Sequence, residues 1–217
     1  RDLPNTMTYE KIFLDRNITT SDELILKKEI SKILNKQGSN EFYKKIIEVV
    51  PDCKVILYNF EKLSGYKFSV ECVETLVKKF PNQIVGVKDS SYNLYENLKL
   101  ENFSVFPGSE LKLLKGLELG CSGIITATCN VTAEMSRKVY DDFFSKKEQT
   151  HNQKLCEVRG VFDKYNLISG LHTFCSYENE IYKNILPPLR LLNKNEEKDL
   201  IESLKNLNFK TKSSMAA

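Results

Sequence analysis

The sequence predicts an α/β protein built from successive βα units, and three observations lead to this prediction. Short apolar runs alternate with amphipathic stretches of helical spacing through the middle of the chain. The apolar runs recur at intervals of about 30 residues or less, which is the length of a βα unit. No internal repeat or low-complexity stretch interrupts them. Strands that alternate with helices in this way form parallel sheets, so we expect their carboxyl ends to meet at one edge.

The first half of the chain contains the predicted strands. Each strand is a short apolar run bounded by turn residues, and the helices between them have apolar residues on one face. Ser69 precedes such a helix and is a candidate N-cap. The expected elements are a helix at Phe42–Val50, a strand at Val55–Tyr58, a helix at Ser69–Phe80, and strands at Ile84–Val87 and Phe103–Phe106.

The second half is predicted to be mostly helical. A helix at Glu110–Leu119 leads to a short strand at Ile124–Ile125, and from Glu134 onward the spacing is helical. The run LPPL at Leu186–Leu189 breaks this pattern before a last helix at Asn195–Leu207. We expect the tail from Thr211 to be frayed.

Composition and charge exclude several classes of protein. The chain has 217 residues, of which 41% are hydrophobic and 28% charged, as is ordinary for a soluble globular enzyme of one or two domains. A net charge of +3 is too small to indicate binding to nucleic acid or an anionic membrane. No run of about 18 uncharged apolar residues is present, and Arg1 begins a polar segment rather than a signal peptide. We therefore expect a cytoplasmic protein without nucleic-acid or membrane partners.

No metal site or cofactor is predicted. His151 lies in a polar run and is expected to be solvated, and His172 lies near an apolar helix face, where a histidine more often packs than ligates. The cysteines stand singly, without the paired spacing of zinc or redox motifs. We expect reduced, mostly buried thiols at Cys53, Cys72, Cys121, Cys129, Cys156 and Cys175.

Polar groups stand where the predicted strands end, which is where a (β/α)8 barrel places its active site. Lys88 directly follows four apolar residues, and desolvation at a barrel mouth would favour the neutral amine that attacks a carbonyl. The alternative is a lysine whose stem packs while its ammonium reaches water. Tyr58 ends the neighbouring strand, where its hydroxyl could transfer a proton or its ring could only pack.

Four motifs, in order and spacing, resemble the dihydrodipicolinate synthase/N-acetylneuraminate lyase family of class I pyruvate-dependent aldolases. The resemblance runs from about Glu41 to about Leu207 and includes the KNILPPL break. It implies a (β/α)8 TIM barrel, incomplete in this chain, with a C-terminal helical extension. The motifs are LYNFEKLSG (57–65), IVGVKDSS (84–91), FPGSE (106–110) and LGCSGIITATCNV (119–131).

The resemblance also implies a site. Lys88 would form an imine with pyruvate or a 2-oxo acid, without a cofactor, and Tyr58 would relay protons during cleavage or formation of a carbon–carbon bond. Gly123 and Ile124 would line the pyruvate pocket, mainly through backbone atoms. The tetramers of the family imply a homo-oligomer, either a dimer or a homotetramer.

The chain departs from the family's synthases at Leu63. There an arginine binds the carboxylate of the substrate, and an aliphatic side chain cannot supply that bidentate contact. This departure favours the lyases that act on sugar acids. Ser109 and Glu110 follow the Pro-Gly turn and face the expected mouth, where they would contact substrate hydroxyls; capping and the helix dipole explain the acid equally well.

A larger departure lies near the start of the chain. A complete barrel takes about 250 residues, and the family's early loop that holds the pyruvate carboxylate has no convincing match, since Thr19-Thr20 is a poor substitute. Residues 15–38 resemble either the family's first helix or the helix after its second strand. The resemblance therefore implies a partial barrel at residues 1–133 that lacks early strands, by omission or deletion, and the last barrel helix with the C-terminal helices at residues 134–217.

Three functions follow from these observations. The first is a Schiff-base lyase that reversibly cleaves a 2-oxo sugar acid, of the N-acetylneuraminate or 2-keto-3-deoxy sugar acid type, to pyruvate and an aldehyde. The second is a dihydrodipicolinate synthase, which condenses pyruvate with aspartate semialdehyde; Leu63 counts against it. The third is a non-catalytic paralogue or fragment that keeps the fold.

Overall fold

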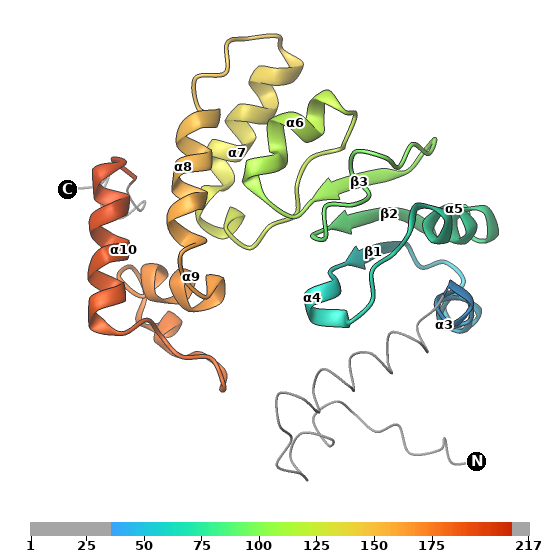
Figure 1. Ribbon diagram of the computed structural model, residues 1–217, viewed down its shortest axis with the longest axis horizontal. Coiled ribbons are helices and arrows are strands. Elements are labelled where there is room, and N and C mark those ends of the chain that lie inside the picture. The colour runs from blue at the N-terminus through green and yellow to red at the C-terminus, as the bar shows by residue number, and fades with distance from the viewer. Residues whose placement is uncertain (1–35, 210–217) are drawn as a thin grey trace.

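A parallel sheet lies at the centre of the computed structural model, which describes residues 36–209. Its strands are β1 (Val55–Asn59), β2 (Ile84–Asp89) and β3 (Ser104–Pro107), in the order β1-β2-β3. Both pairings are parallel, and in Figure 1 the three arrows point the same way. The carboxyl ends of the strands therefore share one edge, as predicted.

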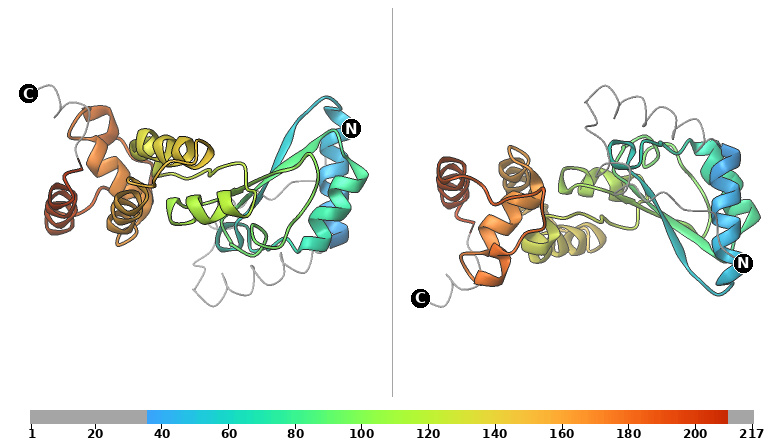
Figure 2. Two further views of the ribbon diagram at one scale, coloured as in Figure 1. Left: turned by 90° about the horizontal axis from the view of Figure 1, so that it is seen from above. Right: turned by 90° about the horizontal axis from the view of Figure 1, so that it is seen from below.

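Helices cover one face of this sheet. Figure 2 shows α3 (Lys36–Val49) beside α5 (Val70–Lys79), and the short α4 (Glu61–Ser64) follows β1. The Ser69 hydroxyl accepts a hydrogen bond from the Cys72 amide at 3.1 Å, which confirms Ser69 as the N-cap of α5. A capped amphipathic helix thus packs its apolar face on the strands, because Cys72, Val73 and Leu76 are fully buried.

The two faces of the sheet have different environments. Leu57 and Val87 are paired in register and fully buried in the core beneath α5. Side chains alternate along a strand, so their neighbours point to the other face. On that face Ile56 and Tyr58 are 46% and 44% exposed. The open face therefore carries Tyr58 and, at the same register on β2, Lys88.

The chain after β3 forms the 3-10 helix η1 (Glu110–Lys112) and α6 (Leu113–Glu118), and then returns along β3. The amides of Ser122 and Ile125 donate to the Val105 and Pro107 carbonyls at 3.0 and 3.2 Å. These two bonds do not make a strand, so the prediction of a strand at Ile124–Ile125 is wrong. Gly123, at φ +143°, interrupts the extended path there.

The rest of the described chain is helical. It comprises α7 (Cys129–Phe144), α8 (Asn152–Phe162), α9 (Leu167–Cys175), η2 (Glu180–Lys183) and α10 (Lys194–Asn206). Two apolar clusters hold these helices together, one among α6, α7 and α8 and one among α8, α9 and α10. The predicted boundary between the partial barrel and the C-terminal helices, at residues 133/134, lies inside α7, which begins at Cys129.

Most predicted elements are confirmed, including the last helix after the LPPL break, which begins with a capping box at Asn193. All six cysteines are free, but only Cys72 and Cys121 are buried; the other four are half-buried. Within residues 36–209 no helix is long and apolar enough to cross a membrane. The Thr19-Thr20 pair, most of the 15–38 segment and the tail from Thr211 lie outside the described residues.

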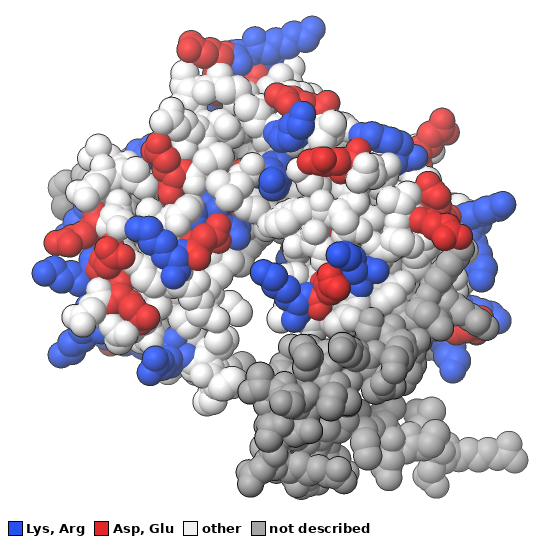
Figure 3. Space-filling model, viewed as in Figure 1, with Lys and Arg blue, Asp and Glu red and all other residues white. Residues whose placement is uncertain are grey.

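Charges are mixed on the surface. Figure 3 shows lysines and arginines interspersed with acidic residues over the visible face. The same view shows this face hollowed between the part that carries α9 and the part that carries α4. The mixed charges agree with the small net charge of the sequence.

Candidate active site

Tyr58 and Lys88 meet on the open face of the sheet. They are register partners on the adjacent strands β1 and β2, and Phe106 is the partner of Lys88 on β3. The Lys88 amine lies 4.1 Å from the centroid of the Tyr58 ring, which is a cation–π contact. Parallel pairing thus brings two predicted site residues, 30 positions apart in the chain, into direct contact.

Asn59 and Asp89 follow Tyr58 and Lys88 in the chain. They join the ends of β1 and β2 on the other face of the sheet. Asn59 and Asp89 are both fully buried, and the Asn59 amide donates to the Asp89 carboxylate at 2.7 Å. The other carboxylate oxygen accepts from the backbone amides of Leu94 and Tyr95, at 2.8 and 2.9 Å. The Asn59 side-chain oxygen in turn accepts from the Phe68 amide at 3.0 Å. Asp89 therefore ties the end of β2 both to β1 and to the loop at residues 94–95.

A close approach between β2 and β3 explains the glycine of the FPGSE motif. The Gly108 amide donates to the Asp89 carbonyl at 3.0 Å. A β-carbon at Gly108 would lie 2.2 Å from the Ser90 hydroxyl oxygen and 3.1 Å from the Ser90 α-carbon. Only glycine fits here, because a side chain would push the two strand ends apart.

Ser109 is 3% exposed, and its hydroxyl caps η1 by accepting from the Leu111 amide at 3.3 Å. Nearby, burial raises the pKa of Tyr92, although the Arg159 charge and a hydrogen bond with Ser109 act in the opposite direction. The Ser109 hydroxyl is therefore engaged in local contacts, and its contact with substrate hydroxyls stays a prediction.

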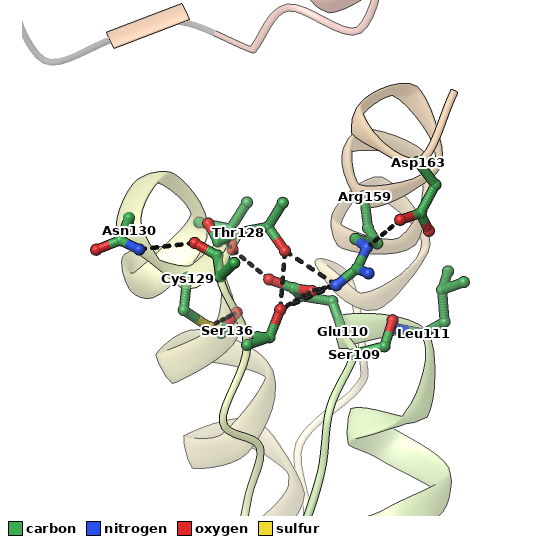
Figure 4. Close-up of polar contacts among 12 residues, drawn as sticks. Ser109, Glu110, Leu111, Thr128, Cys129, Asn130, Ser136, Arg159 and Asp163 are labelled. Atoms are coloured by element: carbon green, nitrogen blue, oxygen red, sulfur yellow. Dashed lines mark hydrogen bonds and ion pairs between the residues drawn. The ribbon is translucent and has the colours of Figure 1, made fainter. Parts of the chain in front are cut away.

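Glu110 is the centre of a buried polar network (Figure 4). Its side chain is fully buried and forms an ion pair of 2.9 Å with Arg159 of α8. The same carboxylate oxygen accepts from the Thr126 hydroxyl at 3.0 Å, and the other oxygen accepts from Thr132 at 2.9 Å. Arg159 also donates to Asp163 at 2.8 Å. We call Glu110, Thr126, Thr128, Thr132, Arg159 and Asp163 the Glu110 network.

The network keeps Glu110 ionised in spite of its burial. Burial by itself raises the pKa of this carboxyl, but the Thr128 hydroxyl and the Arg159 guanidinium together lower it below its ordinary value. In the structure this carboxylate is fully buried and both of its oxygens are bonded within the network, and its contact with substrate hydroxyls stays a prediction. The side-chain cap of η1 is Ser109, and Glu110 is the acidic residue of its first turn.

The remaining predicted site residues are Gly123, Ile124 and Leu63. Gly123 is half-buried, and the Ile124 side chain packs against the helical cluster around Leu113 and Val139. The backbone role expected for Gly123 and Ile124 stays a prediction. Leu63 lies on α4 and is 68% exposed.

Sequence reasoning missed Arg159 and the threonines of the network. A charged residue inside the apolar helix pattern VRGVF, and the alternation of threonines at 126 and 128, were the available signals. No group of three possible metal ligands occurs among residues 36–209. His172 bonds the Tyr182 carbonyl at 2.9 Å, which agrees with a packing histidine.

A family model, the Dihydrodipicolinate synthetase family, matches residues 33–207. The chain belongs to this family. The family resemblance seen in the four motifs is thus confirmed over most of the chain.

The curated proteins that are similar to the chain include a synthase and a sugar-acid aldolase. The 4-hydroxy-tetrahydrodipicolinate synthase of Thermus thermophilus is 30% identical over 164 residues, which are 71% of this chain and 54% of that protein. The 2-dehydro-3-deoxy-D-gluconate/2-dehydro-3-deoxy-phosphogluconate aldolase of Picrophilus torridus is 27% identical, over 72% of this chain and 60% of that protein. The chain thus spans little more than half the length of these relatives.

Solved structures show the same fold. The dihydrodipicolinate synthase of Agrobacterium tumefaciens superposes with a TM-score of 0.70 at 21% identity, over 80% of this chain and 61% of that one. The synthase of Aquifex aeolicus gives a TM-score of 0.73 at 23% identity, over 82% and 63%. The sheet and its helices are therefore part of a (β/α)8 TIM barrel, which is incomplete in this chain.

Proposed function

We propose that the chain is a Schiff-base lyase that cleaves a 2-oxo sugar acid reversibly to pyruvate and an aldehyde. The observation that carries this proposal is the contact of Lys88 and Tyr58 at the carboxyl ends of β1 and β2, where barrel enzymes have their active sites. An amine beside a phenol supplies a nucleophile and a proton carrier on one face.

The proposed steps follow from these two groups. The neutral Lys88 amine attacks the 2-oxo carbon, and loss of water gives an imine. Tyr58 gives its proton to the hydroxyl that leaves as water, and the imine then withdraws electrons from the bond to be cleaved. As that bond breaks, the Tyr58 phenolate accepts the proton of the hydroxyl on the departing aldehyde carbon, and Tyr58 returns this proton to the carbon of the enamine that remains. Hydrolysis then releases pyruvate and restores the amine.

The lyase direction is favoured by Leu63, which offers no cation to the carboxylate of aspartate semialdehyde. The Picrophilus relative, named as an aldolase of sugar acids, supports this substrate class. The second candidate is the condensation of pyruvate with aspartate semialdehyde, which the name of the Thermus relative favours at 30% identity. In both reactions Lys88 and Tyr58 keep their roles.

A comparison of the two reactions tests the proposal. Pyruvate release from N-acetylneuraminate and from a 2-keto-3-deoxy sugar acid is followed by a coupled assay, and condensation with aspartate semialdehyde by the absorbance of its product. We expect pyruvate release to be faster, and the family's oligomers lead us to expect a dimer or tetramer in the assay. Efficient condensation instead would support the synthase.

A further inference from the structure

Two loops of the proposed site are only weakly held by the sheet. The 122–128 segment, which carries Gly123 and Ile124, makes two backbone hydrogen bonds with β3, from Ser122 and Ile125. The loop after β3 carries Ser109 and Glu110. Their positions relative to Lys88 must therefore depend on side-chain contacts beyond the sheet.

Arg159 makes these contacts for both loops at once. One guanidinium nitrogen, Nη1, donates to the Glu110 carboxylate at 2.9 Å, to the Thr126 hydroxyl at 2.9 Å and to the Thr128 hydroxyl at 3.2 Å. Glu110 is the first residue of η1, directly after the turn that follows β3, and Thr126 and Thr128 belong to the 122–128 segment. A single atom of α8 thus ties the two loops to each other and to the helical part of the protein (Figure 4).

The buried Arg159–Glu110 ion pair favours a single position of the two loops. Arg159 is 7% exposed and Glu110 is fully buried, so neither charge is compensated by water. A buried ion pair is tolerated only when its hydrogen bonds are complete, and a shifted loop would leave a charge without a partner. The bond of 2.8 Å from Arg159 Nε to Asp163 also fixes the plane of the guanidinium.

We propose that Arg159 is a positioning residue, which sets the 122–128 segment at the distance from Lys88 that a bound 2-oxo acid requires. The inference rests on the proposed function, in which backbone atoms of Gly123 and Ile124 line the pyruvate site. We call the contacts of Arg159 with Glu110, Thr126 and Thr128 the clamp. The inference assigns Glu110 to this clamp rather than to substrate binding. Loosening the clamp weakens binding of the 2-oxo acid, and leaves the imine chemistry of Lys88 intact at saturation.

Thr126→Val tests the proposal with little risk to the fold, because it removes one hydroxyl and keeps the Glu110–Arg159 pair. Thr126→Ser retains the hydroxyl and should restore wild-type behaviour. Thr173→Val is the matched control, since Thr173 is 2% exposed and bonds the Leu192 amide in another part of the protein. The full chain is titrated with pyruvate and borohydride, and the reduced adduct is counted by intact mass. Hydrogen exchange of the 122–128 amides is measured in parallel.

For Thr126→Val we expect faster exchange of the 122–128 amides and a roughly tenfold higher pyruvate concentration for half-maximal trapping, with the same maximal trapping. Wild-type values of both quantities would overturn the proposal, and so would equal changes in Thr173→Val. If the wild type forms no adduct, the proposed function fails. The exchange result then decides alone, with faster exchange in Thr126→Val but not in Thr126→Ser supporting the clamp and unchanged exchange contradicting it.

Discussion

The Lys88 amine lies 4.1 Å from the centre of the Tyr58 ring. The contact joins the face of the ring to the amine, while the hydroxyl stands at the edge of the ring. Packing and proton transfer by Tyr58 can therefore be separated, because phenylalanine keeps the face and removes only the hydroxyl.

We expect Tyr58→Phe to slow turnover by about 10²- to 10⁴-fold, which is the usual contribution of a proton-transfer group. Initial rates of pyruvate release at saturating sugar acid give this value. Tyr182→Phe, at a tyrosine that is 43% exposed in η2, serves as the control and should have no effect. A Tyr58→Phe rate near that of the wild type would mean that Tyr58 only packs.

Substrate preference should depend on Leu63. Leu63→Arg adds size and charge to the loop after β1, so it should slow cleavage of the sugar acid relative to condensation with aspartate semialdehyde. Leu63→Met is the uncharged control of similar size. The measurement is the ratio of the two rates in each variant. An unchanged ratio in Leu63→Arg would remove Leu63 from the site.

The Glu110 network should contribute strongly to stability. Glu110→Gln leaves the buried Arg159 with Asp163 as its one carboxylate partner in the network, and loss of one partner of a buried pair costs about 3–5 kcal/mol. Asp141→Asn removes the exposed Arg137–Asp141 pair, which water screens, and should lower stability far less than Glu110→Gln. Urea unfolding at neutral pH compares the two variants. Equal small losses would show that the network is not a buried ion pair in solution.

The same network predicts a pH dependence. The pKa of Glu110 is lower in the folded protein than its ordinary value of 4.5, against the effect of its burial and through Thr128 and Arg159. Its contribution is therefore present above about pH 4.5 and is lost as the pH falls through the lower folded pKa. The stability difference between wild type and Glu110→Gln should shrink between pH 5 and the acid limit of folding, as read from urea unfolding. A constant difference would contradict the lowered pKa.

Asp89→Asn should destabilise the strand ends. The carboxylate accepts from the Asn59 amide on one oxygen and from the Leu94 and Tyr95 amides on the other. An asparagine must turn its NH₂ group toward one of these donors, which costs about 1–3 kcal/mol for an unmet buried group. Asp52→Asn, at an exposed position, is the control. Equal unfolding midpoints for the two variants would contradict this account.

The strands and the polar residues at their carboxyl ends could be predicted from the sequence because both are local signals. A buried parallel strand is a short apolar run, and Tyr58 and Lys88 stand at the ends of two such runs. The prediction of a strand at Ile124–Ile125 was wrong, because two adjacent apolar residues do not show whether their backbone forms the hydrogen bonds of a sheet. Gly123 and the course of residues 122–125 along β3 decide that point.

The Glu110 network could not be predicted in the same way. Arg159 lies 49 residues from Glu110 and 33 from Thr126 in the chain, so their contact depends on how α8 packs against the loops. In the sequence Glu110 looks like a helix-capping acid or a substrate contact, and only its burial and its bonded oxygens distinguish these roles. Long-range packing, and not local pattern, determines this part of the site.

The most direct test of the account is reductive trapping of pyruvate on Lys88. Borohydride reduces the imine to a secondary amine, and intact mass with peptide mapping locates the adduct. We expect one adduct on Lys88 in the wild type and in Lys112→Ala, and none in Lys88→Ala or in Lys88→Arg, which keeps the charge beside Tyr58 but stays protonated. Both Lys88 variants should keep nearly the wild-type thermal transition. Full trapping by a folded Lys88→Ala variant would contradict the assignment.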